Sequence, residues 1–237
     1  MPFFEPATLS RLTSRPWVAA AQRAYHRFCP RVRVTRTFHG LRCRLNINDH
    51  LQWLVLSPEH SFETGTIELL SKKWGTVWDV GSNFGFYSLL AARAGNRVVA
   101  FDLSADAIAL LEQSAKLNGL PITTVARPLS VAPRPYRAVD GASCQNRVGF
   151  ESGEAMTLGF REAEKRYGTP NLIKMDIEGG EREFFDSPDF LAWLRDSQIN
   201  FLVELHGVAA PPALLRSGGA RELDASHLFA PAAPAPA

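Results

Sequence analysis

Short apolar runs alternate with helical patterns from residue 76 to residue 206. Runs that read as buried strands are TVWDVG (76–81), RVVAFD (97–102), ITTVARPLS (122–130), NLIKMDI (171–177) and NFLVELH (200–206). The stretches 86–95, 104–119 and 158–168 between them have the period of amphipathic helices. Apolar runs of this length between helices indicate a mostly parallel sheet covered on both faces. We therefore predict an α/β fold with a doubly wound, Rossmann-like sheet.

The regions flanking this pattern differ from it. VRVTRTF and LRCRLNI, separated by His39-Gly40, predict a hairpin, and residues 15–28 predict a helix with a basic face. The segment 131–154 has no clear period, and residues 230–237 consist of Ala and Pro alone. We predict an N-terminal helix and hairpin extension (1–61), one main domain (62–228) and a disordered tail (229–237).

Composition excludes some classes of protein. The chain of 237 residues suits one principal domain, and no apolar stretch reaches the roughly 18 residues of a membrane span. Its three cysteines, Cys29, Cys43 and Cys144, have no Cys-x-x-Cys spacing, which favours reduced thiols and a cytoplasmic location.

Charge is distributed unevenly along the chain. Residues 1–50 hold nine arginines against two acids, whereas the remainder holds 17 basic and 22 acidic residues. An acidic main domain is a poor platform for a phosphate backbone, so we expect no nucleic-acid partner for it. For the basic segment, the sequence leaves three alternative partners: a membrane surface, nucleic acid or a partner protein.

The stretch WDVGSNFGFYS (78–88) follows the first core strand, where doubly wound sheets bind ligands. Gly81 and Gly85 predict a turn whose backbone a ligand approaches closely, ahead of a helix N-terminus. Asp102 ends the second strand 21 residues after Gly81, where an acid in this topology accepts hydrogen bonds from the hydroxyls of an adenosine ribose. The pair indicates a nucleoside-containing cofactor.

The identity of that cofactor follows from what the turn lacks. Asn83 stands where a dinucleotide fingerprint needs its second glycine, and no phosphate-binding P-loop sequence is present. An acid beside the turn, Asp79, suits a cofactor that ends in an amino acid, so we predict S-adenosyl-L-methionine. The expected cofactor-binding residues are Asp79, Gly81, Ser82, Asn83, Gly85, Phe86, Tyr87, Asp102, Leu103 and Asp176.

These segments, together with IKMDIEGGE (173–181) and FLVELHG (201–207), resemble the FkbM family within the class I S-adenosylmethionine-dependent methyltransferases. The match runs from about residue 62 to 207, and its most specific part is the Asp-x-Glu-Gly-x-Glu run. The chain departs from the family in Asp102-Leu103 for Glu-Pro, in Leu158-Gly159-Phe160 for Leu-Asp-Asp, and in a weak strand pattern after Gly207. We therefore expect the closing strands of the sheet to be short or missing.

Methyl transfer requires a nucleophile about 3 Å from the methyl group and a place for one proton. Asp176 and Glu178 end the fourth strand and His206 ends the fifth, so these three are the expected catalytic residues. The general base is either His206, whose ordinary pKa is near 6.5, or an acid. Asp176, Glu178 and Glu181 are oxygen ligands for Mg²⁺, but their spacing carries little weight and we predict no metal.

The resemblance implies O-methylation of a hydroxyl on a small molecule, sugar or glycan. One alternative is a non-catalytic relative that binds cofactor, in view of the departures above. Another is a nucleic-acid methyltransferase, but Asp176-Ile177-Glu178-Gly179 lacks the Pro-Pro-aromatic motif of amino-group enzymes of that class. We also allow peripheral membrane contact through the basic N-terminus.

Overall fold

The computed structural model describes residues 32–47, 50, 63–139, 147–149, 155–206, 209–210, 221–222 and 227–231. The predicted helix within residues 15–28 and the end of the Ala/Pro tail lie outside these ranges. The described helices are α4 (Thr64–Leu70), α5 (Phe86–Arg93), α6 (Ala105–Asn118), α7 (Phe160–Tyr167), α8 (Glu181–Phe185) and α9 (Pro188–Asp196). None of them is both long and apolar enough to cross a membrane.

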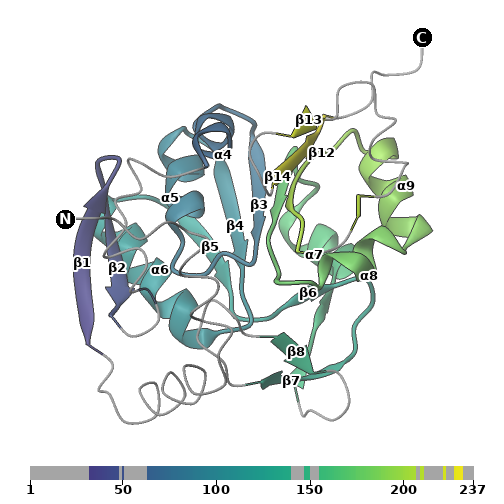
Figure 1. Ribbon diagram of the computed structural model, residues 1–237, viewed down its shortest axis with the longest axis horizontal. Helices are drawn as coiled ribbons and strands as arrows, with labels where there is room; N and C mark the ends of the chain where they lie inside the picture. Colours follow the sequence, from purple (N-terminus) through teal and green to yellow (C-terminus); the bar gives the residue numbers. More distant parts are fainter. Residues whose placement is uncertain are drawn as a thin grey trace, which may run out of the picture.

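A seven-stranded sheet forms the centre of the molecule (Figure 1). Its order is β13-β14-β12-β11-β3-β4-β5. The strands are β3 (Thr76–Val80), β4 (Arg97–Phe101), β5 (Ile122–Val125), β11 (Leu172–Met175), β12 (Asn200–Glu204), β13 (Arg221–Glu222) and β14 (His227–Ala230). The five strands from β12 to β5 are parallel, and β14 and β13 are antiparallel additions at one edge. The predicted doubly wound α/β fold is confirmed.

The end of the chain agrees with one expectation and departs from another. β14 pairs antiparallel with β12 and β13 pairs with β14, so the closing strands are present, and with four and two residues they are short, as one of the two expected alternatives held. Phe229 and Ala230 are buried in β14, so the predicted tail cannot start at residue 229. The strand pattern after Gly207 is weak because β13 has two residues and β14 has four.

Further strands lie outside this sheet. β1 (Arg33–Phe38) and β2 (Leu41–Asn46) form the predicted hairpin around His39 and Gly40. The third predicted strand is divided into β5 and β6 (Leu129–Ser130), and β6 pairs with β10 (Leu158–Gly159). Part of the segment without a clear period forms β7 (Pro135–Val139), which pairs with β8 (Arg147–Gly149) and β9 (Ala155–Met156).

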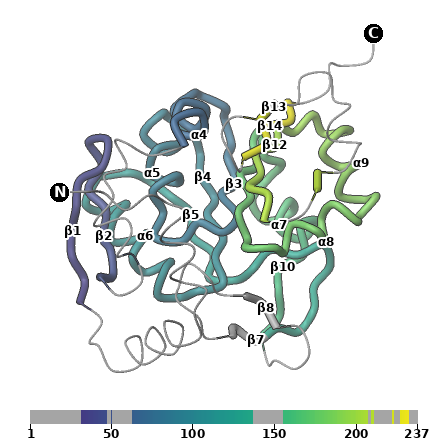
Figure 2. The backbone as a smooth tube through the Cα atoms, in the orientation of Figure 1, coloured from purple at the N-terminus to yellow at the C-terminus, as the bar shows by residue number. Residues whose placement is uncertain are grey.

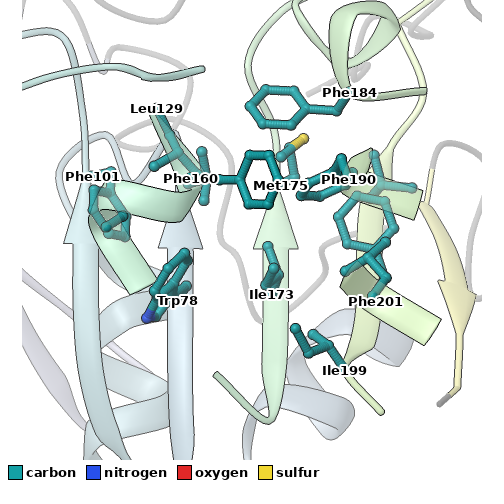
Figure 3. Packing of buried hydrophobic residues seen from close by; sticks show 14 of the residues in the cluster. Trp78, Phe101, Leu129, Phe160, Ile173, Met175, Phe184, Phe190, Ile199 and Phe201 are labelled. Carbon is teal, nitrogen blue, oxygen red and sulfur yellow. The ribbon is translucent and has the colours of Figure 1, made fainter. Parts of the chain in front are cut away.

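Alternate residues of the parallel strands face opposite layers, as the period of a strand requires. Trp78, Phe101, Ile173, Met175 and Phe201 form the core with the aromatic side chains of α7, α8 and α9 (Figure 3). The intervening positions, such as Val77, Val98 and Leu172, pack beneath α4 and α5. The hairpin covers α5 and α6 from outside, and the tube in Figure 2 shows it at the margin of the molecule.

Local signals fix the helix that follows β4. Ser104 accepts a hydrogen bond from the Ala107 amide as the N-cap of α6, and Gly119 ends the helix in the left-handed region. Both ends agree with the sequence. They place Asp102 between the end of β4 and the start of α6, at the carboxyl edge of the sheet.

Candidate active site

The turn after β3 is bound to the end of β4. The amides of Gly81 and Ser82 donate to the carbonyl oxygen of Phe101 at 2.9 and 3.0 Å. The Asn83 amide donates to Asp102 Oδ2 at 2.7 Å, and the Ser104 amide donates to Asp102 Oδ1 at 2.8 Å. The two features that predicted a nucleoside site therefore lie side by side.

The pKa of the Asp102 carboxyl group is raised above its ordinary value. Burial raises its pKa to about 6, although the Ser104 and Asn83 amides favour the charged form. Each carboxylate oxygen has a second lone pair beyond the one used by the backbone. Asp102 can therefore hold the turn in place and also accept hydrogen bonds from ribose hydroxyls.

Gly81 and Gly85 have packing roles that the sequence did not indicate. A Cβ atom on Gly81 would lie 1.7 Å from the carbonyl oxygen of Asp176, and one on Gly85 would lie 2.1 Å from Leu111 Cδ1. The space beside both glycines is therefore filled by β11 and α6. A cofactor role for these positions depends on their backbone groups alone.

Ser82 and Asn83 complete the turn. Ser82 is 6% exposed, and its Oγ has no hydrogen-bond partner in the described part of the chain. Asn83 has φ +49°, and its Oδ1 lies 2.9 Å from His50 Nε2. A buried hydroxyl without a partner in the turn that Asp102 holds fits the polar groups of a nucleoside cofactor, because such groups are normally paired.

Asp79 lies beneath the turn in a buried network. Its Oδ2 accepts a hydrogen bond from Ser88 Oγ at 2.6 Å, and its Oδ1 lies 3.7 Å from Lys174 Nζ. Lys174 is the register partner of Asp79 on β11, and it also lies 3.2 Å from Asp176 Oδ2 and over the Tyr87 ring. Asp79 and Lys174 are each 2% exposed. These contacts favour a supporting role for Asp79 over direct contact with a cofactor.

Lys174 keeps its charge in this environment. Burial works to lower its pKa, but the carboxylates of Asp176, Asp79 and Glu204 outweigh burial and raise the pKa above its ordinary value. Burial raises the pKa of Asp79, and Lys174 opposes that shift. Sequence reasoning missed this lysine. The available signal was a charged residue in the middle of the apolar strand LIKM, where an unpaired lysine is costly.

Two more expected cofactor residues have other surroundings. Phe86 is buried, with its ring centroid 6.2 Å from that of Phe38 in the hairpin, so it belongs to the core beneath the hairpin. Tyr87 is partly buried beside Phe86 and Lys174. Leu103 is partly buried directly after Asp102. Of these three, Leu103 is the one that adjoins the ribose position we predict.

The second part of the site surrounds His206, which lies just after β12. Its Nδ1 lies 3.2 Å from Glu181 Oε1, and its Nε2 lies 3.6 Å from Glu204 Oε1. The same Nε2 is 3.8 Å from both Asp176 Oδ1 and Glu178 Oε2. The structure thus brings together all three expected catalytic residues, Asp176, Glu178 and His206.

Electrostatic interactions couple these groups. Burial lowers the pKa of His206, but the four surrounding carboxylates outweigh burial and raise it above the ordinary value. Burial raises the pKa of Asp176, but Lys174 and His206 outweigh it and hold the pKa below its usual range. Burial raises the pKa of both Glu178 and Glu204. The site holds more carboxylates than cationic groups.

Glu181 has a role beyond that of an acid in the first turn of a helix. It is fully buried, its Oε1 accepts a hydrogen bond from the Ile177 amide at 2.9 Å, and the same oxygen faces His206. This contact fixes the orientation of the imidazole ring. His227 on β14, which sequence reasoning left aside, lies 3.6 Å from Glu204 Oε2.

Three groups in the cluster have a spacing compatible with a metal ion. Ligand atoms of Asp176, Glu204 and His206 all lie within 4.8 Å of one another. Oxygen and imidazole ligands suit several divalent cations. The sequence-based expectation of a metal-free site therefore stays a prediction.

Comparison with known proteins gives partial matches. No family model matches the chain. Over 96 residues it is 33% identical to a ribosomal protein L11 methyltransferase of Geobacter metallireducens, covering 36% of this chain and 32% of the relative. Over 149 residues it is 28% identical to the protein of that name from Levilactobacillus brevis, covering 56% of this chain and 45% of the relative. The chain thus matches less than half the length of these relatives.

Solved structures resemble the chain in fold. The T. thermophilus 16S rRNA methyltransferase RsmC, in complex with AdoMet and guanosine, has a TM-score of 0.49 and 15% identity, covering 85% of this chain and 50% of its own. Trm5b of Pyrococcus abyssi has a TM-score of 0.46 and 15% identity, covering 83% and 54% of the two chains. At these values the likeness does not extend to function.

The comparisons change the expected partner. The curated relatives are named for methylation of a ribosomal protein, which is a macromolecule of the ribosome. The expectation of a small-molecule or glycan acceptor without nucleic acid is therefore wrong. It rested on the FkbM resemblance and on the net charge of the main domain, and net charge does not report how charges are arranged on a surface. The methyltransferase class and the expected cofactor agree with these relatives.

Proposed function

We propose that this chain is an S-adenosylmethionine-dependent methyltransferase that modifies an amino group of a protein. The curated relatives support the reaction class and a macromolecular acceptor. The adjacent positions of the Asn83 turn and Asp102 support the cofactor, since Asp102 has lone pairs left for ribose hydroxyls and Ser82 Oγ lacks a partner in the described structure.

The acidic cluster around His206 supports an amine as the acceptor. Asp176, Glu178 and Glu204 all lie within 3.8 Å of His206 Nε2 and form a region that attracts a protonated amine. The same carboxylates would repel the phosphates of a nucleic acid. This arrangement at the carboxyl ends of β11 and β12 is the observation that carries the proposal.

The chemistry follows from these positions. The ammonium group first loses a proton, and neutral His206 can accept it at Nε2 while Glu181 holds Nδ1. The amine nitrogen then forms a bond to the methyl carbon as the carbon–sulfur bond breaks. The bonding electron pair returns to sulfur, which leaves a neutral thioether and a methylated amine. The residues of this chain position the two reactants and hold the proton.

The test uses the full chain with methyl-labelled S-adenosylmethionine and purified ribosomal subunits, whose protein and RNA are then separated. We expect label in the protein fraction, greatly reduced by Glu204→Gln and unchanged by Glu162→Gln on α7. Label confined to RNA would overturn the amine acceptor. Failure to detect cofactor binding by calorimetry would overturn the methyltransferase assignment itself.

We also propose a more specific assignment, namely that the chain belongs to the FkbM family. It is supported by the run from Asp176 to Glu181, in which three of the acids that face His206 are found. The presence of β13 and β14 removes one reason for suspecting a degenerate member. A cytoplasmic location is proposed with it, since ribosomal proteins are made there.

A further inference from the structure

The hairpin β1–β2 has a charge pattern that the proposed methyl transfer does not use. Residues 32–47 contain four arginines, Arg33, Arg36, Arg42 and Arg44, and no acidic residue. The inner face of the hairpin covers α5 and α6 with apolar side chains, and Arg36 shares this face, with its guanidinium 5.5 Å from the centroid of the Phe38 ring. Arg33, Arg42 and Arg44 are on the opposite, outer face of the hairpin, and the hairpin runs along one side of the molecule (Figure 1).

A groove of about 450 Å³ lies between this hairpin and α6. It is lined by Thr35, Arg42, Arg44, Gln113, Lys116 and Leu117. The lining includes three cationic side chains, a hydroxyl and an amide, and no carboxylate. A concave surface with one sign of charge concentrates oppositely charged ligands.

The backbone around the groove is fixed by hydrogen bonds to α6. The Arg42 amide donates to Asn118 Oδ1 at 3.0 Å, and Asn118 Nδ2 donates to the Arg42 carbonyl at 2.8 Å. The Arg44 amide donates to Ser114 Oγ at 2.8 Å. Because these contacts hold β2 against α6, the groove exists before any ligand binds.

The cationic groups keep most of their donors available. Arg44 Nη1 donates to Thr35 Oγ1 at 2.8 Å, and the Arg42 guanidinium donates to the Leu117 carbonyl. Each arginine has five N–H donors. Within the described residues, Arg42, Arg44 and Lys116 form no ion pair with a carboxylate. Three positive charges in one groove thus lack a counter-charge from the part of the chain that the structure describes.

We propose that this groove binds the phosphodiester backbone of RNA. Guanidinium groups match phosphate oxygens with paired hydrogen bonds, and the Thr35 hydroxyl and Gln113 amide can pair with 2′-hydroxyls. A lipid surface fits less well because membrane-binding elements insert large apolar side chains. Among the described residues, the exposed large apolar side chains are Val32 and Met156, neither of which lines the groove.

The groove is connected to the candidate active site through β2. This strand leads from Arg42 and Arg44 to Asn46, whose carbonyl oxygen lies 3.2 Å from His50 Nδ1. His50 Nε2 in turn contacts Asn83 beside Asp102. The hairpin lies at the left of Figure 1 and β12 lies in its right half, so RNA in the groove and an amine in the acidic cluster would occupy separate surfaces. The docking proposal goes beyond the proposed methyl transfer and does not depend on it.

The first measurement is the affinity of the full chain for a fluorescent single-stranded RNA. The groove variant combines Arg42→Gln, Arg44→Gln and Lys116→Gln. The control removes the same charge from exposed positions on α7, α8 and α9 with Lys165→Gln, Arg182→Gln and Arg195→Gln. We expect the groove variant to lose about tenfold or more in affinity and its salt dependence to fall by about two counterions, with the control nearly unchanged. Equal losses in both variants, or none in either, would overturn the proposal.

Two further measurements serve as controls for this result. Circular dichroism and thermal melting establish that the groove variant folds, and if it does not, Lys116→Gln alone is expected to lower the salt slope by about 0.7. Vesicles of phosphatidylcholine and phosphatidylserine replace RNA in a parallel binding assay. We expect no vesicle binding that depends on the groove. Vesicle binding lost in the groove variant, with RNA affinity unchanged, would assign the groove to membranes and overturn the RNA proposal.

Discussion

Lys174 Nζ lies 3.7 Å from Asp79 Oδ1 across adjacent strands, and both side chains are almost completely buried. The ammonium also pairs with Asp176, so one lysine joins the end of β3 to the acidic cluster after β11. A buried carboxylate is costly without a partner. This ion-pair network therefore links the cofactor half of the candidate site to its acceptor half.

Replacing Lys174 with methionine leaves two buried or partly buried carboxylates without their cation. We expect the free energy of unfolding to fall by about 3–5 kcal/mol, measured by urea denaturation. Lys72→Met, at an exposed lysine after α4, is the matched control and should change stability by less than about 0.5 kcal/mol. Adding Asp79→Asn to Lys174→Met should recover part of the loss. A Lys174→Met protein as stable as the control would contradict the importance of this pair.

Protonation of Asp102 should weaken cofactor binding. Its pKa is raised to about 6, and two backbone amides donate to its ionised form, as ribose hydroxyls would in the proposed complex. We therefore expect affinity for S-adenosylmethionine, measured by calorimetry between pH 5 and 7, to fall as pH drops through about 6. Asp102→Asn should bind more weakly at neutral pH and lose this dependence. A wild-type affinity that is flat over this range would place the ribose elsewhere.

The rate of methyl transfer should depend on the protonation of His206. A base acts when it is deprotonated, and the surrounding carboxylates raise the pKa of His206, so the rate should rise with pH at a midpoint above 6.5. Glu204→Gln removes one of these charges and should move the midpoint to lower pH. Initial rates at saturating cofactor over a pH series measure both. Rates of His206→Gln equal to wild type at every pH would eliminate His206 as the base.

Removal of divalent cations should leave turnover unchanged. Asp176 already pairs with the Lys174 ammonium at 3.2 Å, which makes its carboxylate a weaker ligand for a second cation. We expect equal initial rates with EDTA and with added Mg²⁺ or Mn²⁺. Loss of activity in EDTA that returns on addition of either cation would instead assign a metal to Asp176, Glu204 and His206.

Gly81 should tolerate no side chain, in contrast to Gly95. A Cβ on Gly81 would meet the Asp176 carbonyl at 1.7 Å, whereas nothing lies within 4 Å of one on Gly95. Both residues have positive φ, so both substitutions carry a backbone cost of about 1 kcal/mol. Gly81→Ala should additionally force β3 and β11 apart and lower stability by about 4 kcal/mol or more, or prevent folding. Similar melting temperatures for Gly81→Ala and Gly95→Ala would refute the close approach.

Much of the fold was readable from local pattern. The period of the apolar runs predicted the parallel strands, Ser104 and Gly119 predicted the ends of α6, and His39-Gly40 predicted the hairpin turn. These signals act over a few residues, because side-chain direction and turn geometry depend on the immediate backbone. The position of Asp102 beside the glycine turn followed because the carboxyl ends of adjacent parallel strands meet at one edge.

Other parts of the site had no local signal. His227 and Glu204 come together because β14 returns antiparallel beside β12, and nothing near His227 in the sequence specifies that neighbour. The basic groove similarly arises where the hairpin packs on α6, which joins Arg42 to residues about 75 positions away. Net charge could not reveal this groove, because it sums over the whole chain.

The amino-acid sequence by itself determined the class of fold, the position of Asp102 beside the turn after β3, and the set of acids and histidine at the strand ends. Only the tertiary structure decided that Lys174 pairs with Asp79 and Asp176 and that Glu181 orients His206. It also decided that the backbone after β11 fills the space where a side chain on Gly81 would lie. The physical reason is that strand register and layer packing set these contacts. Both are properties of the whole chain in its folded state.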